Sequence, residues 1–156
     1  MSELETPAVA AARAAGIDFT TTRHGRVGSL EEAAAARGVE PRDLIKTLVV
    51  RRAADEHLLV LVGGDRRFSW PKLRAELGTN RLSMPDAAEA QRVTGYERGT
   101  ITPFGTVRPL EVVADANIAG RTISLGAGAH GAGLTVAADD VVRLFGARLA
   151  DISDTA

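Results

Sequence analysis

Short apolar runs of β type alternate with helical segments along the chain. Residues 44–51 and 57–62 are apolar and β-branched, and the turn-forming residues 54–56 separate them, so we expect a β-hairpin. Capping residues, prolines in first turns and terminal glycines predict helices at residues 8–15, 29–37, 69–78, 85–94 and 139–145, with one further helical turn from residue 41. Further strands are expected at residues 17–23, 81–83, 110–114, 122–125, 134–137 and 148–152, with those at 110–114 and 122–125 joined across residues 115–120. This mixture predicts a single α+β or mixed α/β domain spanning residues 1–156.

The strand at residues 44–51 carries the first candidate for chemistry. It is apolar on both faces, which predicts a central strand covered on both sides. Because side chains alternate along a strand, Lys46 shares its face with Leu48 and Val50. Lys46 therefore brings an ammonium group to the start of a buried strand, where it needs a partner or a solvent-filled cleft. The strand alone favours the simpler interpretation, a strand-end lysine whose stem packs and whose charge reaches water.

Two glycine-containing stretches are candidates for pocket walls. Residues 95–105 hold three glycines and Pro103, which predicts a rigid loop lining a ligand pocket, although an ordinary long connection fits the same residues. Residues 126–131 satisfy G-x-G-x-x-G, but an apparent strand follows them where a dinucleotide site requires a helix. We therefore expect either a glycine-rich bend beside a pocket or a plain hairpin loop.

Composition narrows the classes of function. The chain has 156 residues, of which 45% are hydrophobic and 25% charged, as in an ordinary soluble domain. No segment reaches transmembrane length and the start lacks a signal-peptide pattern, so we expect a cytoplasmic protein without a membrane partner. The net charge of −1 argues against non-specific coating of nucleic acid, although residues 42–81 hold nine Lys or Arg against five Asp or Glu.

Neither a metal nor a cofactor is expected. The chain has no cysteine, which excludes thiol nucleophiles and disulfides, and His24, His57 and His130 have no metal-ligand spacing. The sequence also contains no G-x-S-x-G nucleophile elbow and no Walker A motif.

Five short motifs occur in a specific order and spacing. They are Thr6-Pro7-Ala8; Ile45-Lys46-Thr47-Leu48-Val49; Gly95-Tyr96 followed by Gly99-x-x-x-Pro103-Phe104-Gly105; Ile123-Ser124-x-Gly126 with a later Gly131; and Ala150-Asp151-Ile152. Together they resemble the YbaK/prolyl-tRNA-synthetase-associated domain family, and the resemblance covers nearly the whole chain. Two departures bear on which amino acid is accepted. Thr22-Arg23-His24 stands where some members have a tyrosine shortly before the histidine, and His130 stands where others carry a basic residue.

The resemblance implies a fold, an activity and a site. The fold is a mixed, largely antiparallel sheet flanked by helices, and the activity is trans-editing, the hydrolysis of the ester that joins a wrong small amino acid to a tRNA. Lys46 becomes the catalytic candidate, with its ammonium expected in a cleft bordered by residues 99–105 and 126–131 rather than in bulk solvent. The implied partner is the aminoacyl-tRNA acceptor end, and an aminoacyl-tRNA synthetase is a candidate second partner. The expected substrate-binding residues are Gly99, Ile101, Thr102, Pro103, Phe104, Gly105, Gly126, Ala127, Gly128 and His130.

The ester of an aminoacyl-tRNA is activated, so its hydrolysis needs only modest catalysis by the protein. Positioning, together with backbone amides of residues 99–105 or 126–128 that stabilise the developing oxyanion, could suffice, with water or a group on the substrate as the nucleophile. Lys46 would hold the tRNA end through a phosphate or the aminoacyl carbonyl, and Phe104 would supply an apolar pocket wall. Two alternatives remain at this stage: a non-catalytic module that binds an aminoacyl or nucleotide-like ligand, and a protein–protein adaptor, which would have no pocket around Lys46.

Overall fold

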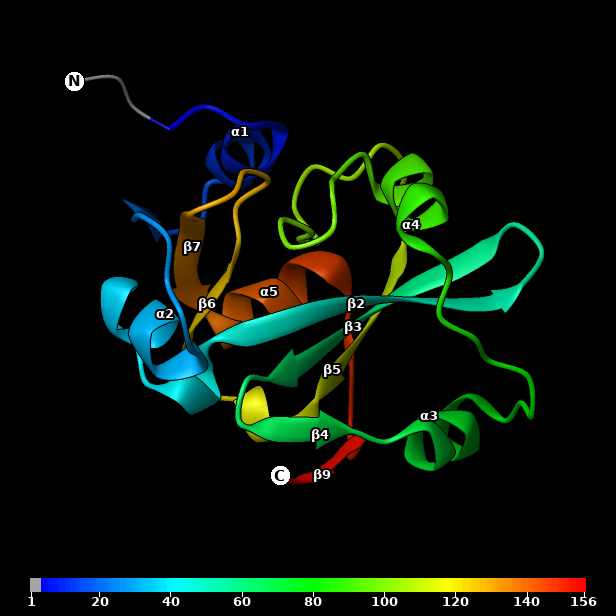
Figure 1. Cartoon of the computed structure of the whole chain (residues 1–156). Coiled ribbons are helices and arrows are strands. Elements are labelled where there is room, and N and C mark those ends of the chain that lie inside the picture. The colour runs from blue at the N-terminus through cyan, green and yellow to red at the C-terminus, as the bar shows by residue number, and fades with distance from the viewer. Residues whose placement is uncertain (1–3) are drawn as a thin grey trace.

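The computed structural model describes residues 4–156, in which helices and strands alternate irregularly (Figure 1). The α-helices are α1 (Pro7–Ala14), α2 (Leu30–Ala36), α3 (Trp70–Leu77), α4 (Ala87–Thr94) and α5 (Ala138–Phe145), and the 3-10 turns are η1 (Pro41–Asp43) and η2 (Ala116–Ile118). The strands are β1 (Phe19–Arg23), β2 (Ile45–Ala53), β3 (Glu56–Gly63), β4 (Arg66–Phe68), β5 (Glu111–Asp115), β6 (Thr122–Gly126), β7 (Ala132–Ala137), β8 (Arg148–Ala150) and β9 (Ser153–Thr155).

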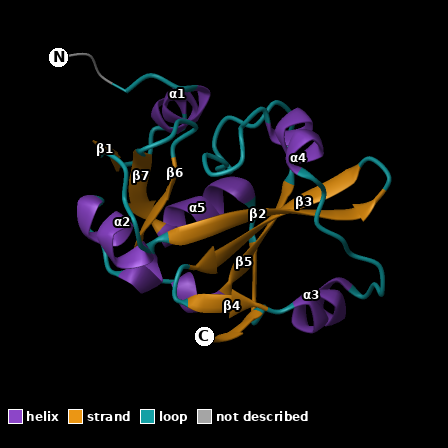
Figure 2. Cartoon of the chain, in the orientation of Figure 1, coloured by secondary structure: helices purple, strands orange, loops and turns teal. Residues whose placement is uncertain are grey.

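The strands form three sheets, and the predicted fold class is confirmed. A four-stranded mixed sheet has the order β2-β3-β5-β8, with an antiparallel β2–β3 hairpin and parallel β3–β5 and β5–β8 pairs. A three-stranded antiparallel sheet has the order β1-β7-β6, and β4 pairs with β9. A single bridge between Leu44 and Ser124 joins the first two sheets, so the start of β2 lies against β6. Figure 2 shows the helices arranged around these sheets.

The expectation that residues 44–51 form a central strand is wrong. β2 is an edge strand of the four-stranded sheet, and β3 lies beside it in the interior. Both faces of β2 are nevertheless covered, because Ile45 and Val49 join one hydrophobic cluster while Val50 joins the other. The pattern of apolar residues along a strand indicates which of its faces are buried. It does not indicate whether the strand has a hydrogen-bonded neighbour on one side or on both. The predicted alternation of side chains along this strand is confirmed.

Three further features of the strands are visible only in the structure. The segment that joins β5 to β6 contains η2, and the two strands belong to different sheets. Residues 81–83 contribute only one bridge, between Ser83 and Arg51. β4 and β9 have no counterpart among the strands expected from the sequence. Each has three residues, too few for a period of two to be visible.

Two hydrophobic clusters fill the two sides of the four-stranded sheet. The larger lies between this sheet, the three-stranded sheet and α1, and contains Phe104 and Tyr96. The smaller lies under α3 and contains Leu73. Among the helices of residues 4–156, none combines the length and the apolar character needed to cross a membrane.

Candidate functional site

A cleft of about 260 Å³ opens beside the start of β2. We call it the Lys46 cleft. Its walls come from β2, the loop after α4, the end of β6 and the residue that follows α2. The lining residues are Arg37, Leu44, Ile45, Lys46, Thr47, Gly99, Ile101 and Gly126. The cleft therefore unites the predicted catalytic strand with both predicted glycine stretches.

The loop at residues 95–105 and the turn after β6 lie side by side. A Cβ atom at Gly126 would lie 2.7 Å from the carbonyl oxygen of Ile101, so this approach requires glycine. The amide of Gly128 donates a hydrogen bond to the carbonyl oxygen of Thr100 at 3.1 Å. The turn joins β6 to β7 as a hairpin, so no helix follows the G-x-G-x-x-G motif directly. This confirms that the motif is not part of a dinucleotide-binding site.

Lys46 borders the cleft, but its ammonium does not lie where the sequence analysis placed it. The residue is exposed, and its Nζ donates a hydrogen bond to the carbonyl oxygen of Arg66 on β4 at 2.8 Å. The expectation of a side chain withdrawn from bulk solvent is therefore wrong. β2 is an edge strand, so a side chain near its start can lean past the sheet toward β4. An ammonium group has three donors, and this contact uses one of them.

Thr47 is among the residues that line the cleft, and its side chain points to the face of β2 opposite to that of Lys46. Its Oγ1 is buried and has no hydrogen-bond partner among residues 4–156. A buried hydroxyl without a partner costs free energy.

Arg37 supplies a second positive charge to the cleft. Its Nε donates to Nε2 of His24 at 3.3 Å, and its Nη1 donates to Ser124 Oγ and to the Leu125 carbonyl, both at 3.4 Å. None of these acceptors is a carboxylate, and within the described chain no carboxylate lies within 4.0 Å of this guanidinium. Burial lowers the pKa of Arg37 because it removes water from the charged form.

The end of the long loop is part of the core, which corrects the expected role of several residues. Phe104 is 1% exposed, and its ring packs edge-on against Phe145 with the ring centroids 5.1 Å apart. Thr102 and Pro103 are also buried, and Gly105 packs against α1 at Pro7. Phe104 is therefore not a pocket wall. Apolar residues in a glycine-rich loop can face either the ligand or the core, and the sequence did not distinguish these cases.

Tyr96 holds this loop in place. Its hydroxyl group donates a hydrogen bond to the carbonyl oxygen of Phe104 at 2.6 Å, and the side chain is buried. Burial raises the pKa of Tyr96 to about 12, so the phenol remains a neutral donor at physiological pH. Only Gly99 and Ile101 of the predicted loop residues reach the cleft.

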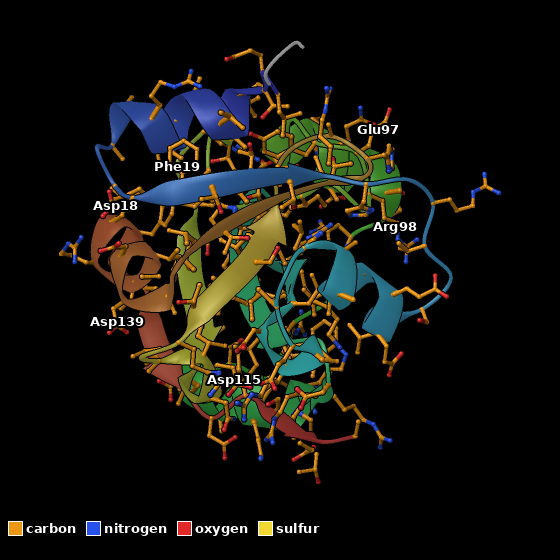
Figure 3. All side chains as sticks on the ribbon, turned by 90° about the vertical axis from the view of Figure 1, so that its left-hand side faces the viewer. Asp18, Phe19, Glu97, Arg98, Asp115 and Asp139 are labelled. Carbon is orange, nitrogen blue, oxygen red and sulfur yellow. The ribbon has the colours of Figure 1, made fainter. Side chains whose placement is uncertain are left out.

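The remaining predicted residues of the turn support the site from outside the cleft. Ala127 is fully buried, and its carbonyl oxygen accepts a hydrogen bond from the Thr6 hydroxyl at 2.6 Å. His130 is exposed, and its Nε2 lies 3.0 Å from Oε2 of Glu97. This contact ties the turn to the loop at its solvent side. Figure 3 shows Glu97 and Arg98 near each other on the right-hand side, with Asp115 lower in the view.

A second hollow of about 430 Å³ adjoins the Lys46 cleft. We call it the Met84 pocket. It shares Thr47, Gly99 and Ile101 with the cleft, so these three residues form the boundary between the two spaces. Its other lining residues are mainly apolar: Leu48, Val49, Met84, Pro85, Asp86, Ala87, Ala90 and Arg98. We call the two adjoining hollows the groove: Arg37 and Lys46 line its first part, and mainly apolar residues line its second part.

Comparison with known proteins identifies the family. The model of the aminoacyl-tRNA editing domain matches residues 24–144, which is most of the chain. The chain belongs to the aminoacyl-tRNA editing domain family. It is 30% identical over 103 residues to the Escherichia coli (strain K12) multifunctional Ser/Thr-tRNA deacylase ProXp-y, covering 64% of this chain and 62% of that protein. It is 34% identical over 89 residues to a proline–tRNA ligase of Bacillus licheniformis, covering 57% of this chain and 15% of the ligase.

A solved structure supports the fold assignment. A protein described as a candidate trans-editing enzyme for prolyl-tRNA synthetase superposes with a TM-score of 0.85 at 24% identity. The match covers 97% of this chain and 99% of that one, so the two share their fold. The editing domain described here spans less than two thirds of the length of the two curated relatives above.

Three residues that line the two hollows were not selected from the sequence: Arg37, Thr47 and Met84. Arg37 follows α2 directly, and nothing in the local sequence separates it from an ordinary exposed arginine at a helix end. Thr47 had a detectable signal, because a hydroxyl in an apolar strand on the face away from Lys46 needs a partner. Met84 lies in a segment whose apolar residues follow neither a helical nor a strand period, so there was no reason in the sequence to select it. Within residues 4–156, no group of three or more His, Cys, Asp or Glu side chains is arranged to hold a metal ion.

Proposed function

We propose that this chain is an aminoacyl-tRNA deacylase that acts in trans and hydrolyses the ester of a mischarged tRNA carrying a small amino acid. One observation carries the proposal: the family match at residues 24–144 contains every residue that lines the groove. The Lys46 cleft also has the charge that an acceptor end requires, because Arg37 and Lys46 line it and no carboxylate does. The pocket at Lys46 disfavours the adaptor hypothesis, which expected none.

The proposed reaction relies on positioning. The three residues shared by the two hollows would lie beside the ester, with the terminal nucleotide in the Lys46 cleft and the aminoacyl group in the Met84 pocket. The backbone amides of Gly99 and Ile101 donate to no protein acceptor in the described chain, and they are the candidate oxyanion donors. The amide of Gly128 is an unsuitable donor, since it already bonds to Thr100. A water molecule would attack the carbonyl carbon, and the tRNA hydroxyl would leave with a proton.

Lys46 would act on the substrate through its free donors. Four rotatable bonds let its ammonium turn from the Arg66 carbonyl toward a phosphate or the ester carbonyl at the rim of the cleft. A positive charge there would stabilise the developing oxyanion or hold the tRNA end. Its proposed partner is thus the aminoacyl-tRNA acceptor end, and an aminoacyl-tRNA synthetase could deliver it.

Release of amino acid from a panel of mischarged tRNAs tests the proposal. We expect turnover above the spontaneous rate for at least one small amino acid, with alanine, cysteine and proline as the first choices. Serine and threonine belong in the panel because the E. coli relative is named a Ser/Thr-tRNA deacylase. Binding of these tRNAs without release of any amino acid would instead support the non-catalytic module. If the protein neither bound these tRNAs nor released an amino acid from them, the proposal would be wrong.

We further expect deacylation to be independent of metal. The sequence has no cysteine and no histidine pair at ligand spacing, so the chain offers no evident site for a catalytic ion. The measurement is the rate after treatment with a chelator, using a tRNA whose folding is verified under the same conditions. A loss of rate that a divalent ion restores would contradict the expectation.

A further inference from the structure

Arg37 occupies a site that is built to hold a charged group in place. The residue follows α2, which lies beside the start of β2 in Figure 1. Gly133 on β7 provides a slot for its side chain, because a Cβ atom there would lie 2.6 Å from Cδ of Arg37. His24 and Ser124 accept hydrogen bonds from the guanidinium on the protein side. The side chain is thus fixed before any ligand binds.

The fixed guanidinium lacks a counter-charge. None of its bonded acceptors is a carboxylate, and its Nη2 donates to no acceptor in residues 4–156. Eight other arginines of the described chain pair with carboxylates, as Arg121 does with Asp43, and most of those that do not are exposed to water. Removing water from an unpaired cation is costly, and the lowered pKa of Arg37 has the same cause. An anion in the cleft would offset that cost and use the free donors.

We propose that Arg37 forms a phosphate-binding subsite in the Lys46 cleft, which holds the phosphodiester on the 5′ side of the terminal nucleoside of the tRNA. Arginine suits this role because its planar fork of N–H groups matches two oxygens of a phosphate. The inference rests on the proposed function, and it separates the tasks of the two cations. Arg37 positions the nucleotide, whereas Lys46 acts at the ester.

Binding of the trinucleotide CCA, the end of a tRNA, tests the subsite without any catalysis. The probe is prepared in two forms, one with a natural last linkage and one with a neutral methylphosphonate at that linkage. Wild-type protein should bind the natural form at least tenfold more tightly, a difference of about 1.4 kcal/mol. In Arg37→Gln this preference should shrink to about twofold or less. Arg143→Gln removes an exposed arginine on α5 and should keep the full preference.

Two further measurements make the test independent of folding defects. In wild-type protein the Nε–H resonance of Arg37 should shift with the natural probe and not with the neutral one. Arg37→Lys keeps a cation on a flexible stem, and it should retain part of the preference. Equal wild-type affinity for both probes would overturn the subsite, as would a full preference in Arg37→Gln.

Two other outcomes locate the source of the anion and the link to catalysis. Inorganic phosphate that competes as strongly as the natural trinucleotide would overturn the nucleic-acid assignment in favour of a free-anion site. A protein that binds CCA through Arg37 but deacylates no tRNA would refute the proposed function while supporting the subsite. The two proposals can therefore fail separately.

Discussion

Lys46→Ala is expected to lower the single-turnover deacylation rate by on the order of a hundredfold while leaving the fold intact. Removing one donor that stabilises an oxyanion typically costs this much. Stability should change by less than about 0.5 kcal/mol, because Lys46 is exposed and its one bond goes to the Arg66 carbonyl at the surface. The measurement combines the single-turnover rate with a thermal melt of the same preparation.

Lys72 provides a matched control for Lys46. It is the chain's other lysine, it lies on α3, and its ammonium pairs with Asp151 and Asp154. Hydrogen bonds to these two carboxylates raise the pKa of Lys72, so it remains charged under assay conditions. Lys72→Ala should keep a rate close to wild type. Lys46→Arg should be slow, because a planar fork does not replace a compact ammonium. If Lys46→Ala retained a rate near wild type, the lysine would have only a structural role.

Phe104→Ala is expected to destabilise the protein rather than to broaden its specificity. The side chain is almost fully buried and packs edge-on against Phe145, so its removal leaves a cavity in the larger cluster. Truncation of a buried phenylalanine costs about 3–5 kcal/mol of unfolding free energy. For a chain of this length the melting temperature should fall by on the order of 10 °C.

Val107→Ala offers a comparison within the same connecting segment. Val107 is 66% exposed, so its truncation should change the unfolding free energy by less than about 0.5 kcal/mol. The accepted amino acids should stay the same in any folded fraction of Phe104→Ala. If Phe104→Ala were as stable as wild type and accepted larger amino acids, Phe104 would line the substrate pocket after all, and this prediction would be wrong.

The sequence predicted the fold well where a local signal exists. N-caps and terminal glycines marked all five α-helices to within a few residues, as at Ser29 and Gly146. The β2–β3 hairpin followed from two apolar runs and the turn between them. Strand order did not follow, because the parallel pairing of β5 with β3 depends on contacts between segments about fifty residues apart. Short polar strands such as β4 gave no periodic signal.

The site was predicted in outline and incorrectly in detail. Motif order placed Lys46, Gly99 and Gly126 together, and the structure brings these residues to one cleft. The direction of the Lys46 ammonium depends on the edge position of β2 and on β4, neither of which the sequence revealed. Arg37 becomes distinctive only when both its burial and the absence of a carboxylate around it are known. Such an absence is a property of three-dimensional packing rather than of local sequence.

One measurement tests directly whether this groove binds the aminoacylated end of a tRNA. The probe is an alanyl- or seryl-adenosine analogue in which a stable amide replaces the ester, titrated into isotope-labelled protein. We predict that the largest changes in backbone amide resonances occur at Thr47, Gly99, Ile101 and Gly126, the residues at the boundary of the two hollows and beside it. Changes that concentrate instead at the separate hollow lined by Arg52, His57 and Arg108, with none at the groove, would contradict the account.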